Sequence, residues 1–303
     1  MSLYQKHRPT ELADLHGNKE LKEALSSMLC DSEKCPHAFL LTGPTGCGKT
    51  TIGRIIAKSV GASGIDIKEI DNTDFRSLDS IREIRSQCNF LPMESKAQAW
   101  IMDECHQLLA PSQSALLKVL EDTPKHVYFV LCTTDPQKLL PTLKGRCSQF
   151  VVGTLSDDEM LGLLRKVVKA EGKSIAKKVY EQIIQDSLGH ARNALVILGK
   201  VLQVSADTQL ETAKQSAELT SQSIELCRAL MGNAGWKQIA SILSGLKEQD
   251  SESTRRQVLG YCAAVLTKTE NDKAGLIMEN FIEPFYNSGF PGLVFACYSV
   301  VKG

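Results

Sequence analysis

The residues best suited to chemistry lie in a glycine-rich run at positions 43–50, Gly-Pro-Thr-Gly-Cys-Gly-Lys-Thr. The run matches the G-x-x-x-x-G-K-[ST] pattern. It follows the apolar segment AFLLT and opens the helix-patterned stretch TTIGRIIAKSV, as a phosphate-binding loop requires. Small glycines let backbone N–H groups curl around phosphate oxygens at the start of a helix. The run therefore predicts a site for ATP, and the alternative is a glycine-rich turn that binds nothing.

Two residues at the end of the run have separate tasks in such a site. Lys49 is expected to reach the β- and γ-phosphates and Thr50 to offer its hydroxyl to magnesium, so ATP and Mg²⁺ are the predicted cofactors. Cys47 is expected to be a small loop residue, although a thiol there could make the site sensitive to oxidation. The other expected nucleotide contacts are Gly43, Pro44, Thr45, Gly46, Cys47, Gly48 and Thr51.

A pair of acidic residues follows the apolar segment AWIM farther along the chain. In a P-loop fold, an aspartate at the carboxyl end of a strand can hold magnesium, and we assign this role to Asp103. The adjacent Glu104 is placed to polarise the water that attacks the γ-phosphate, so it is the predicted catalytic residue. The alternative is a solvated strand end. His106 could contact a neighbouring group, but a surface histidine at the start of the next helix is the favoured interpretation.

The elements that must position these residues change along the chain. From His37 to about Phe150, short apolar runs alternate with amphipathic stretches, which predicts a parallel sheet covered by helices on both faces. From Ser156 to about Val204 the pattern indicates three amphipathic helices, and after about Ala206 it indicates further helices with wide apolar stripes. The boundary between these regions lies in SADTQLETAKQS, where both a linker and a helix are possible.

Composition limits the classes of function. The 303 residues include 35 Lys plus Arg against 35 Asp plus Glu, so any contact with nucleic acid must come from a local patch or from several subunits together. The start MSLYQKHRP has no signal-peptide pattern and no segment resembles a membrane span, which predicts a cytoplasmic protein. Ten cysteines without a C-x-x-C pair favour reduced, mostly buried thiols over a disulfide framework or a zinc site.

Several motifs together resemble one family. The run HVYFVLCTTDPQKLLPTLKGRCSQF is similar to the corresponding stretch of the bacterial DNA polymerase III gamma/tau ATPase subunit and, more loosely, of the replication factor C small subunits. KHRP at 6–9, DLHG at 14–17, the phosphate-binding loop, DECH and GHARNAL occur in the family's order, so the resemblance covers about residues 4–200. It implies an AAA+ ATPase domain at 1–153, a helical lid at 154–205 and an all-α collar at 206–303, which joins subunits.

The resemblance also implies roles for individual residues. Thr134 corresponds to sensor 1, which hydrogen-bonds near the γ-phosphate and the attacking water; the alternative is a threonine that caps its own turn. Arg146 corresponds to the arginine finger that completes the ATP site of the next subunit, although Gly145 replaces the usual serine and is expected to make the loop more flexible; a surface arginine is the alternative. Arg192 corresponds to sensor 2, which reaches from the lid to the phosphates; an exposed helix arginine is the alternative.

This sequence departs from the family's pattern in the segment that packs by the adenine base and in the region of the zinc module. Arg8 and Pro9 resemble the segment that packs by the adenine, but His7 stands where the family usually has an aromatic residue. Only Cys88 lies between Lys49 and Asp103, so the four-cysteine zinc module of gamma/tau subunits is absent. A compact version of the subunit, from a bacterium or a phage-infected cell, fits these features.

The resemblance implies that the chain is an ATPase subunit of a DNA sliding-clamp loader, which uses ATP binding and hydrolysis to load a clamp on primer–template DNA during replication. The implied partners are other loader subunits, the sliding clamp and primer–template DNA, with no membrane and no zinc. The assembly is expected to be a homo- or hetero-oligomer with five subunits. Arg76 and Arg82 are the candidate contacts to DNA phosphates, with solvated helix charges as the alternative. Two other functions stay open, namely another AAA+ DNA machine, such as a branch-migration motor or an initiator, and a mainly structural loader subunit.

Overall fold

The computed structural model describes residues 2–30, 35–70, 78–220, 222–247, 250–267 and 269–302. Residue contacts divide the chain into two compact units. Unit 1 comprises Leu3–Leu163 together with His190–Arg192, and unit 2 comprises Leu164–Gly189 and Asn193–Gly303. The three-domain division at 153/154 and 205/206 stays a prediction.

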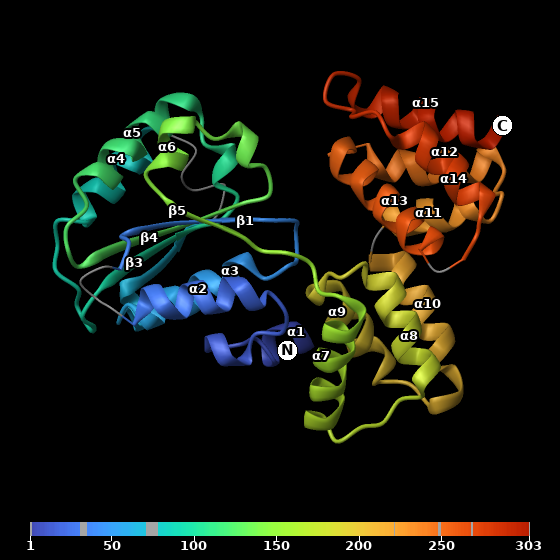
Figure 1. Cartoon of the computed structure of the whole chain (residues 1–303), viewed down its shortest axis with the longest axis horizontal. Coiled ribbons are helices and arrows are strands. Elements are labelled where there is room, and N and C mark those ends of the chain that lie inside the picture. Colours follow the sequence, from blue (N-terminus) through green and yellow to red (C-terminus); the bar gives the residue numbers. More distant parts are fainter. Residues whose placement is uncertain are drawn as a thin grey trace. The chain divides into compact units, whose positions relative to one another are not determined.

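Unit 1 is built on one five-stranded sheet with the order β2-β3-β4-β1-β5 (Figure 1). Every neighbouring pair of strands is parallel. Because β3, β4 and β1 are adjacent, the segments that follow them leave the sheet at the same edge, where ligands bind in open α/β sheets. The strands are β1 (Ala38–Thr42), β2 (Ile67–Ile70), β3 (Gln98–Met102), β4 (Val127–Thr133) and β5 (Ser148–Val151).

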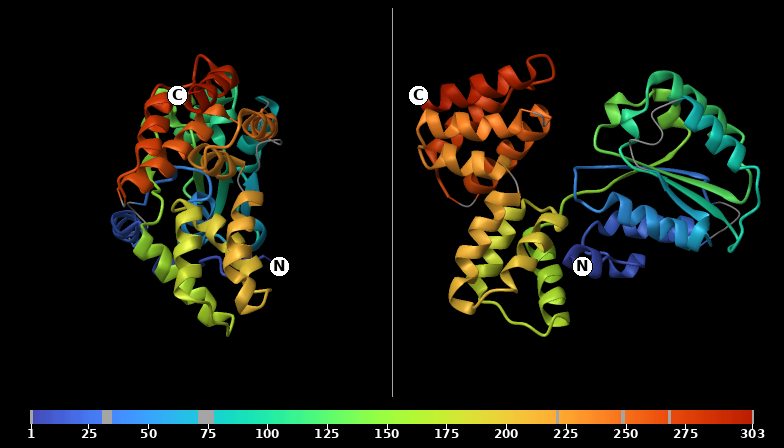
Figure 2. Two further views of the ribbon diagram at one scale, coloured as in Figure 1. Left: turned by 90° about the vertical axis from the view of Figure 1, so that its right-hand side faces the viewer. Right: turned by 180° about the vertical axis from the view of Figure 1, so that it is seen from behind.

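Helices cover both faces of this sheet, as two views of the chain show (Figures 1 and 2). Alternate strand residues point to opposite faces, so Phe39 and Leu41 join one buried cluster while Leu40 joins the other. The first cluster includes residues of α2 and α3, and the second includes residues of α4, α5 and α6. These helices are α2 (Lys19–Leu29), α3 (Lys49–Ser59), α4 (Leu78–Gln87), α5 (Ala110–Glu121) and α6 (Pro141–Gly145).

The predicted α/β class and the all-helical remainder are confirmed. The elements of unit 1 that were not predicted include the helix α2 and the edge strand β5, whose residues alternate between half-buried and exposed. The remaining short elements of unit 1 are α1 (Leu3–Lys6), η1 (Leu12–Asp14), η2 (Gly64–Asp66), η3 (Cys105–Gln107) and η4 (Pro136–Lys138).

Helices make up the rest of the chain. The stretch SADTQLETAKQS, for which both a linker and a helix were possible, forms the short η5 and part of the helix α10. Helix α10 packs against both α8 and α11. Helices α11 to α15, orange to red in Figure 2, share one buried apolar cluster. None of the helices in the described ranges is long and apolar enough to span a membrane. These elements are α7 (Asp157–Ala170), α8 (Lys177–Ser187), α9 (Ala191–Val201), η5 (Ala206–Thr208), α10 (Gln209–Thr220), α11 (Gln222–Met231), α12 (Trp236–Leu246), α13 (Ser251–Leu266), α14 (Asp272–Phe281) and α15 (Gly289–Lys302).

A buried ionic network joins α13 to the end of α14. The Glu252 carboxylate, 6% exposed, accepts hydrogen bonds from the Arg255 guanidinium at 2.7 and 2.8 Å and from the Phe285 amide at 2.9 Å. Arg255 also donates to the carbonyls of Phe281 and Ile282, both at 2.9 Å. Because the buried Arg255–Glu252 pair binds both the carbonyls of Phe281 and Ile282 and the amide of Phe285, the network fixes the end of α14 in place.

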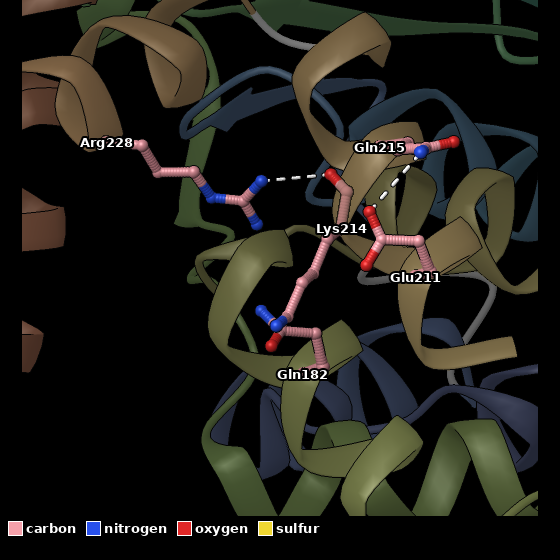
Figure 3. A pocket seen from close by; sticks show the side chains of 5 residues that line it. All are labelled: Gln182, Glu211, Lys214, Gln215 and Arg228. Atoms are coloured by element: carbon pink, nitrogen blue, oxygen red, sulfur yellow. Dashed lines mark hydrogen bonds between the residues drawn. The ribbon is translucent and has the colours of Figure 1, made fainter. Parts of the chain in front are cut away.

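Unit 2 also contains a polar cavity of about 240 Å³ between α8, α10 and α11 (Figure 3). Arg228 on its wall donates to the Lys214 carbonyl at 2.9 Å and pairs with the buried Asp186 at 2.6 Å. These contacts connect the three helices that line the cavity, so its polar side chains have a structural explanation.

Candidate nucleotide-binding site

The glycine-rich loop has a backbone that requires glycine. Gly43, Gly46 and Gly48 have φ angles of 153°, 78° and 106°, which residues with a side chain rarely adopt. A Cβ atom on Gly43 would also lie 2.2 Å from the Val152 carbonyl oxygen. Gly48 is the N-cap of α3 and provides no side chain to cap that helix. The loop therefore leaves the first amides of α3 for another acceptor, as an anion-binding helix start requires.

Lys49 lies inside this loop. Its residue is 5% exposed, and its Nζ donates to the carbonyls of Gly43 at 2.9 Å and Pro44 at 3.0 Å. A buried lysine is costly unless its hydrogens are satisfied. Here the loop itself satisfies two of them and holds the ammonium group where phosphate oxygens are expected, which fits the role predicted for Lys49.

The two residues predicted to hold magnesium are in direct contact. Thr50 Oγ1, in the first turn of α3, donates to Asp103 Oδ2, just after β3, at 2.7 Å. A hydroxyl and a carboxylate are the hard oxygen ligands that Mg²⁺ prefers. These two residues therefore fit the metal that accompanies a nucleoside triphosphate, and they are the side chains that would hold it.

Glu104 lies beside the end of β4. It has φ 49° and ψ 42°, and this left-handed turn begins η3. Its Oε2 atom accepts hydrogen bonds from the Thr134 hydroxyl at 2.9 Å and the Thr134 amide at 3.3 Å. The structure thus brings together the predicted catalytic glutamate and the predicted sensor 1 residue, which are 30 positions apart in the chain.

The interpretation of His106 as a surface residue is wrong. Its side chain is 12% exposed, and Nδ1 lies 3.0 Å from Thr133 Oγ1 and 3.3 Å from Glu104 Oε2. Burial lowers the pKa of His106, although the Glu104 carboxylate opposes this shift. The imidazole is therefore neutral at neutral pH. The acidic pair was visible in the sequence, but the turn of η3 that folds this ring onto β4 was not.

Arg192 lies against the phosphate-binding loop within unit 1. It occupies the first turn of α9, its amide donates to the Gly46 carbonyl at 3.4 Å, and its guanidinium lies 5.8 Å from the centre of the Tyr4 ring. The Tyr4 contact was not predicted. An exposed arginine at this position fits the sensor 2 role, because a helix start is held beside the phosphate loop.

Arg146 does not take part in these site contacts within its own chain. It caps α6, is 57% exposed, and pairs with Glu121 at the end of α5 at 2.8 Å. Gly145, expected in a flexible loop, is instead the last residue of α6, and a Cβ atom there would meet nothing within 4 Å. The glycine is therefore not required by the backbone, and the arginine presents its charge at the surface.

The remaining predicted contacts are two residues expected near the adenine, two arginines expected near DNA and three positions of the phosphate-binding loop. Arg8 and Pro9 are half-buried after α1, and the structure does not test their role toward adenine. Arg82 is exposed on α4 and pairs with Asp79 at 2.9 Å, and Arg76 lies outside the described residues. Of the remaining loop positions, Pro44 and Thr45 are exposed and Thr51 is half-buried.

The cysteines are unpaired thiols, and all except Cys30 and Cys47 are buried. Burial raises the pKa of Cys47, although Lys49 and Arg192 oppose this effect. The thiol is therefore protonated at neutral pH, which makes it a poor nucleophile and reduces its sensitivity to oxidation.

Sequence comparisons connect this chain to bacterial replication proteins. It is 31% identical over 233 residues to the DNA polymerase III subunit gamma/tau of Mycobacterium bovis, a match that covers 69% of this chain and 40% of that protein. The DNA polymerase III subunit tau of Escherichia coli is 29% identical over 265 residues, covering 79% and 41% of the two chains. The chain therefore spans about two fifths of the length of these relatives. A family model described as DNA polymerase III, delta subunit matches residues 63–156.

Solved structures support the fold. The Holliday junction branch migration motor RuvB of Thermotoga maritima has a TM-score of 0.61 at 20% identity, and the match covers 78% of this chain and 85% of that chain. At this identity the likeness is evidence for the architecture alone.

Proposed function

We propose, from the premise that this chain is an AAA+ protein related to the gamma/tau subunits of DNA polymerase III, that it is the ATPase subunit of a DNA sliding-clamp loader. It would use ATP binding and hydrolysis to place a clamp on primer–template DNA during replication. The relatives' names support a place in replication, and the geometry of the site supports nucleotide hydrolysis.

The observation that carries the proposal is the meeting of two pairs of residues at one edge of the sheet. Thr50 contacts Asp103, and Glu104 contacts Thr134, so the ends of β3 and β4 are joined to the start of α3 and to each other. A protein that only binds phosphate needs the glycine-rich loop. A water-polarising carboxylate held beside that loop is what hydrolysis needs in addition.

In this proposal each residue has one task. Lys49 and the amides of the loop bind the phosphates, Thr50 and Asp103 hold Mg²⁺, and Glu104 polarises the attacking water. The bound ion would neutralise charge on the phosphate oxygens. Thr134 orients Glu104, and Arg192 approaches the phosphates from the start of α9. All of these groups belong to one chain.

Arg146 has a different task in the proposal, because it acts on the ATP of a neighbouring subunit. The exposure of its side chain supports this role, since an arginine finger must extend from its own subunit into the ATP site of the next. The chain would then work in an assembly of five subunits, joined through its C-terminal helices, around a clamp and DNA. Of the two arginines that are candidates for contact with DNA phosphates, Arg82 lies within the described residues.

The test is loading of a fluorescent sliding clamp onto primed circular DNA by the purified loader that contains this chain. We expect ATP-dependent loading with the wild-type chain and none with Lys49→Ala. Lys58→Ala, a change of an exposed lysine at the other end of α3, should load normally. Failure of the wild-type loader to place the clamp, with ATP hydrolysis intact, would contradict the proposal. Movement of a four-way DNA junction under the same conditions would support the branch-migration alternative instead.

A further inference from the structure

The hydrogen bonds around Glu104 converge on one of its two oxygens. Oε2 accepts hydrogen bonds from the Thr134 hydroxyl at 2.9 Å and the Thr134 amide at 3.3 Å, and His106 Nδ1 lies 3.3 Å from the same oxygen. Among the described residues, Oε1 receives no hydrogen bond. The carboxylate is therefore anchored through one oxygen, and Oε1 is the oxygen that can accept a hydrogen bond from water. Thr134 was expected at this point, whereas His106 had no assigned role.

The contacts of the His106 ring favour one position for its hydrogen. Thr133 Oγ1, which accepts a hydrogen bond from the Asp135 amide at 3.0 Å, lies 3.0 Å from His106 Nδ1 and can either accept a hydrogen from Nδ1 or donate one to it. Glu104 Oε2 offers lone pairs to the ring, so a bare Nδ1 at 3.3 Å would face them with a lone pair of its own, whereas an Nδ1–H group would be attracted to them. The arrangement is favourable with a hydrogen on Nδ1, shared between Glu104 and Thr133. This assigns the tautomer from the hydrogen-bond network.

The charges that face the ring agree with a neutral imidazole. Burial and the ammonium groups of Lys138 and Lys49 disfavour a second proton on His106, while the carboxylates of Glu104 and Asp135 favour it. The net effect is a lowered pKa. His106 can then donate one hydrogen bond to Glu104 without bringing a positive charge that would bind the carboxylate tightly and reduce its ability to polarise water.

We propose that His106 is a positioning residue for hydrolysis: it donates from Nδ1 to Glu104 Oε2 and, with Thr134, fixes the carboxylate so that Oε1 meets the attacking water. The inference rests on the proposed ATPase function. His106 would not touch the nucleotide. Its contribution is orientation, since a misplaced carboxylate slows the chemical step even when substrate binding is complete.

The first test separates orientation from binding. His106→Leu should lower kcat for ATP about tenfold and leave the KM and the Kd for ATP within about twofold, because only the step that uses Glu104 is affected. His106→Asn should keep kcat within about threefold of wild type, because the asparagine amide is a donor at the same distance along the side chain as Nδ1. His126→Ala is the matched control, since His126 contacts the Phe90 carbonyl at 3.0 Å and no residue of the site. Melting temperatures of all three variants check that they fold.

If the wild-type loader hydrolyses ATP and both His106 variants match it, the inference is wrong while the proposed function stands. Equal losses in the leucine and asparagine variants would indicate a structural role and would also overturn it. Near-wild-type kcat in His106→Asn together with a lowered kcat in His106→Leu supports the positioning role.

A second measurement does not depend on turnover. In protein with ¹⁵N-labelled histidine, His106 should carry its hydrogen on Nδ1, and the Nδ1 signal should shift in Glu104→Gln while that of His126 does not. If the wild-type loader hydrolyses no ATP with clamp and primed DNA present, the proposed function fails, and this measurement decides whether the pairing exists. A hydrogen on Nε2, or a signal that ignores Glu104→Gln, would refute the pairing.

Discussion

The hydroxyl of Thr50 donates a hydrogen bond to Asp103 Oδ2 at 2.7 Å and so joins two motifs that lie 53 positions apart in the chain. The contact is a consequence of the sheet order, because β1 and β3 flank β4 and release their following segments at one edge. Neither motif alone defines a metal site. Together they place a hydroxyl and a carboxylate where one ion could meet both.

The first prediction concerns this pair. Thr50→Ala should raise the Mg²⁺ concentration needed for half-maximal ATPase activity by about tenfold, because one oxygen ligand is lost. Thr50→Ser keeps the hydroxyl and should stay within about threefold of wild type. Ser59→Ala removes a hydroxyl from the other end of α3, where it bonds only to the helix's own Ile55 carbonyl, and should change nothing. An unchanged Mg²⁺ requirement in Thr50→Ala would exclude this metal assignment.

The second prediction separates binding from turnover. Lys49→Ala should weaken ATP binding by about a hundredfold, equal to about 2.7 kcal/mol, because a charged phosphate contact is lost. Glu104→Gln should bind ATP normally but hydrolyse it at least about a hundredfold more slowly, because the amide polarises water poorly. Calorimetric titration and single-turnover hydrolysis measure the two effects. Glu104→Gln with wild-type turnover would show that another group polarises the water.

The third prediction compares two glycines. Gly43→Ala should destabilise the fold by about 1–3 kcal/mol, because the new Cβ would lie 2.2 Å from the Val152 carbonyl oxygen at a φ of 153°. Gly145→Ser, which restores the serine of the family motif, should be tolerated within about 0.5 kcal/mol, since a Cβ there meets nothing within 4 Å. Thermal unfolding of both variants tests this. A strongly destabilised Gly145→Ser would contradict the open space beside Arg146.

The sequence predicted the elements whose pattern is local. The strands β1, β3 and β4 are continuous buried runs, and such runs are typical of a parallel sheet with both faces covered. The strand β5 escaped prediction because it has only four residues and forms an edge, where half of its side chains are exposed. Its pairing with β1 depends on a partner more than 100 positions earlier in the chain, which no local pattern reveals.

The site was predictable where the motif carries the chemistry. The glycine-rich loop and the acidic pair are recognisable from residue types and context alone. The contact between His106 and Glu104 was missed because it depends on a left-handed turn at Glu104 and on the distant threonines at the end of β4, Thr133 and Thr134. Similarly, the pairing of Arg146 with Glu121 joins the ends of two helices, and only the tertiary fold brings these ends together.

The fourth prediction concerns pH and the Glu252 network. Burial acts to raise the pKa of Glu252, but hydrogen bonds from Arg255 and Phe285 and the charges of Arg255 and Arg256 outweigh it, so the pKa lies below its ordinary value. A depressed pKa in the folded state gives stability that is present above the unfolded pKa, about 4.3, and is lost as the pH falls through the folded value. Glu252→Gln should therefore destabilise the protein by about 3 kcal/mol at pH 7, and this difference should narrow below about pH 4.

Denaturant unfolding of the wild type and Glu252→Gln at several pH values measures that difference. Glu283→Gln, a change of an exposed glutamate just after α14, serves as the control and should have little effect. A destabilisation by Glu252→Gln that stays constant from pH 7 to pH 3 would indicate lost packing rather than a lost charge.

The central claim, that the chain is a loader subunit whose ATP sites are shared between neighbours, is tested most directly by mixing two inactive variants. Arg146→Ala chains retain their own phosphate loop, and Lys49→Ala chains retain their arginine, so a mixed assembly contains interfaces with one intact copy of each. With differently tagged chains assembled together, and with clamp and primed DNA present, we expect ATPase activity at least about tenfold above either variant alone. Replacing the Lys49→Ala chain with one that also carries Arg146→Ala should abolish this recovery. Near-normal activity of Arg146→Ala by itself, in a verified oligomer, would contradict the shared site and with it the loader assignment.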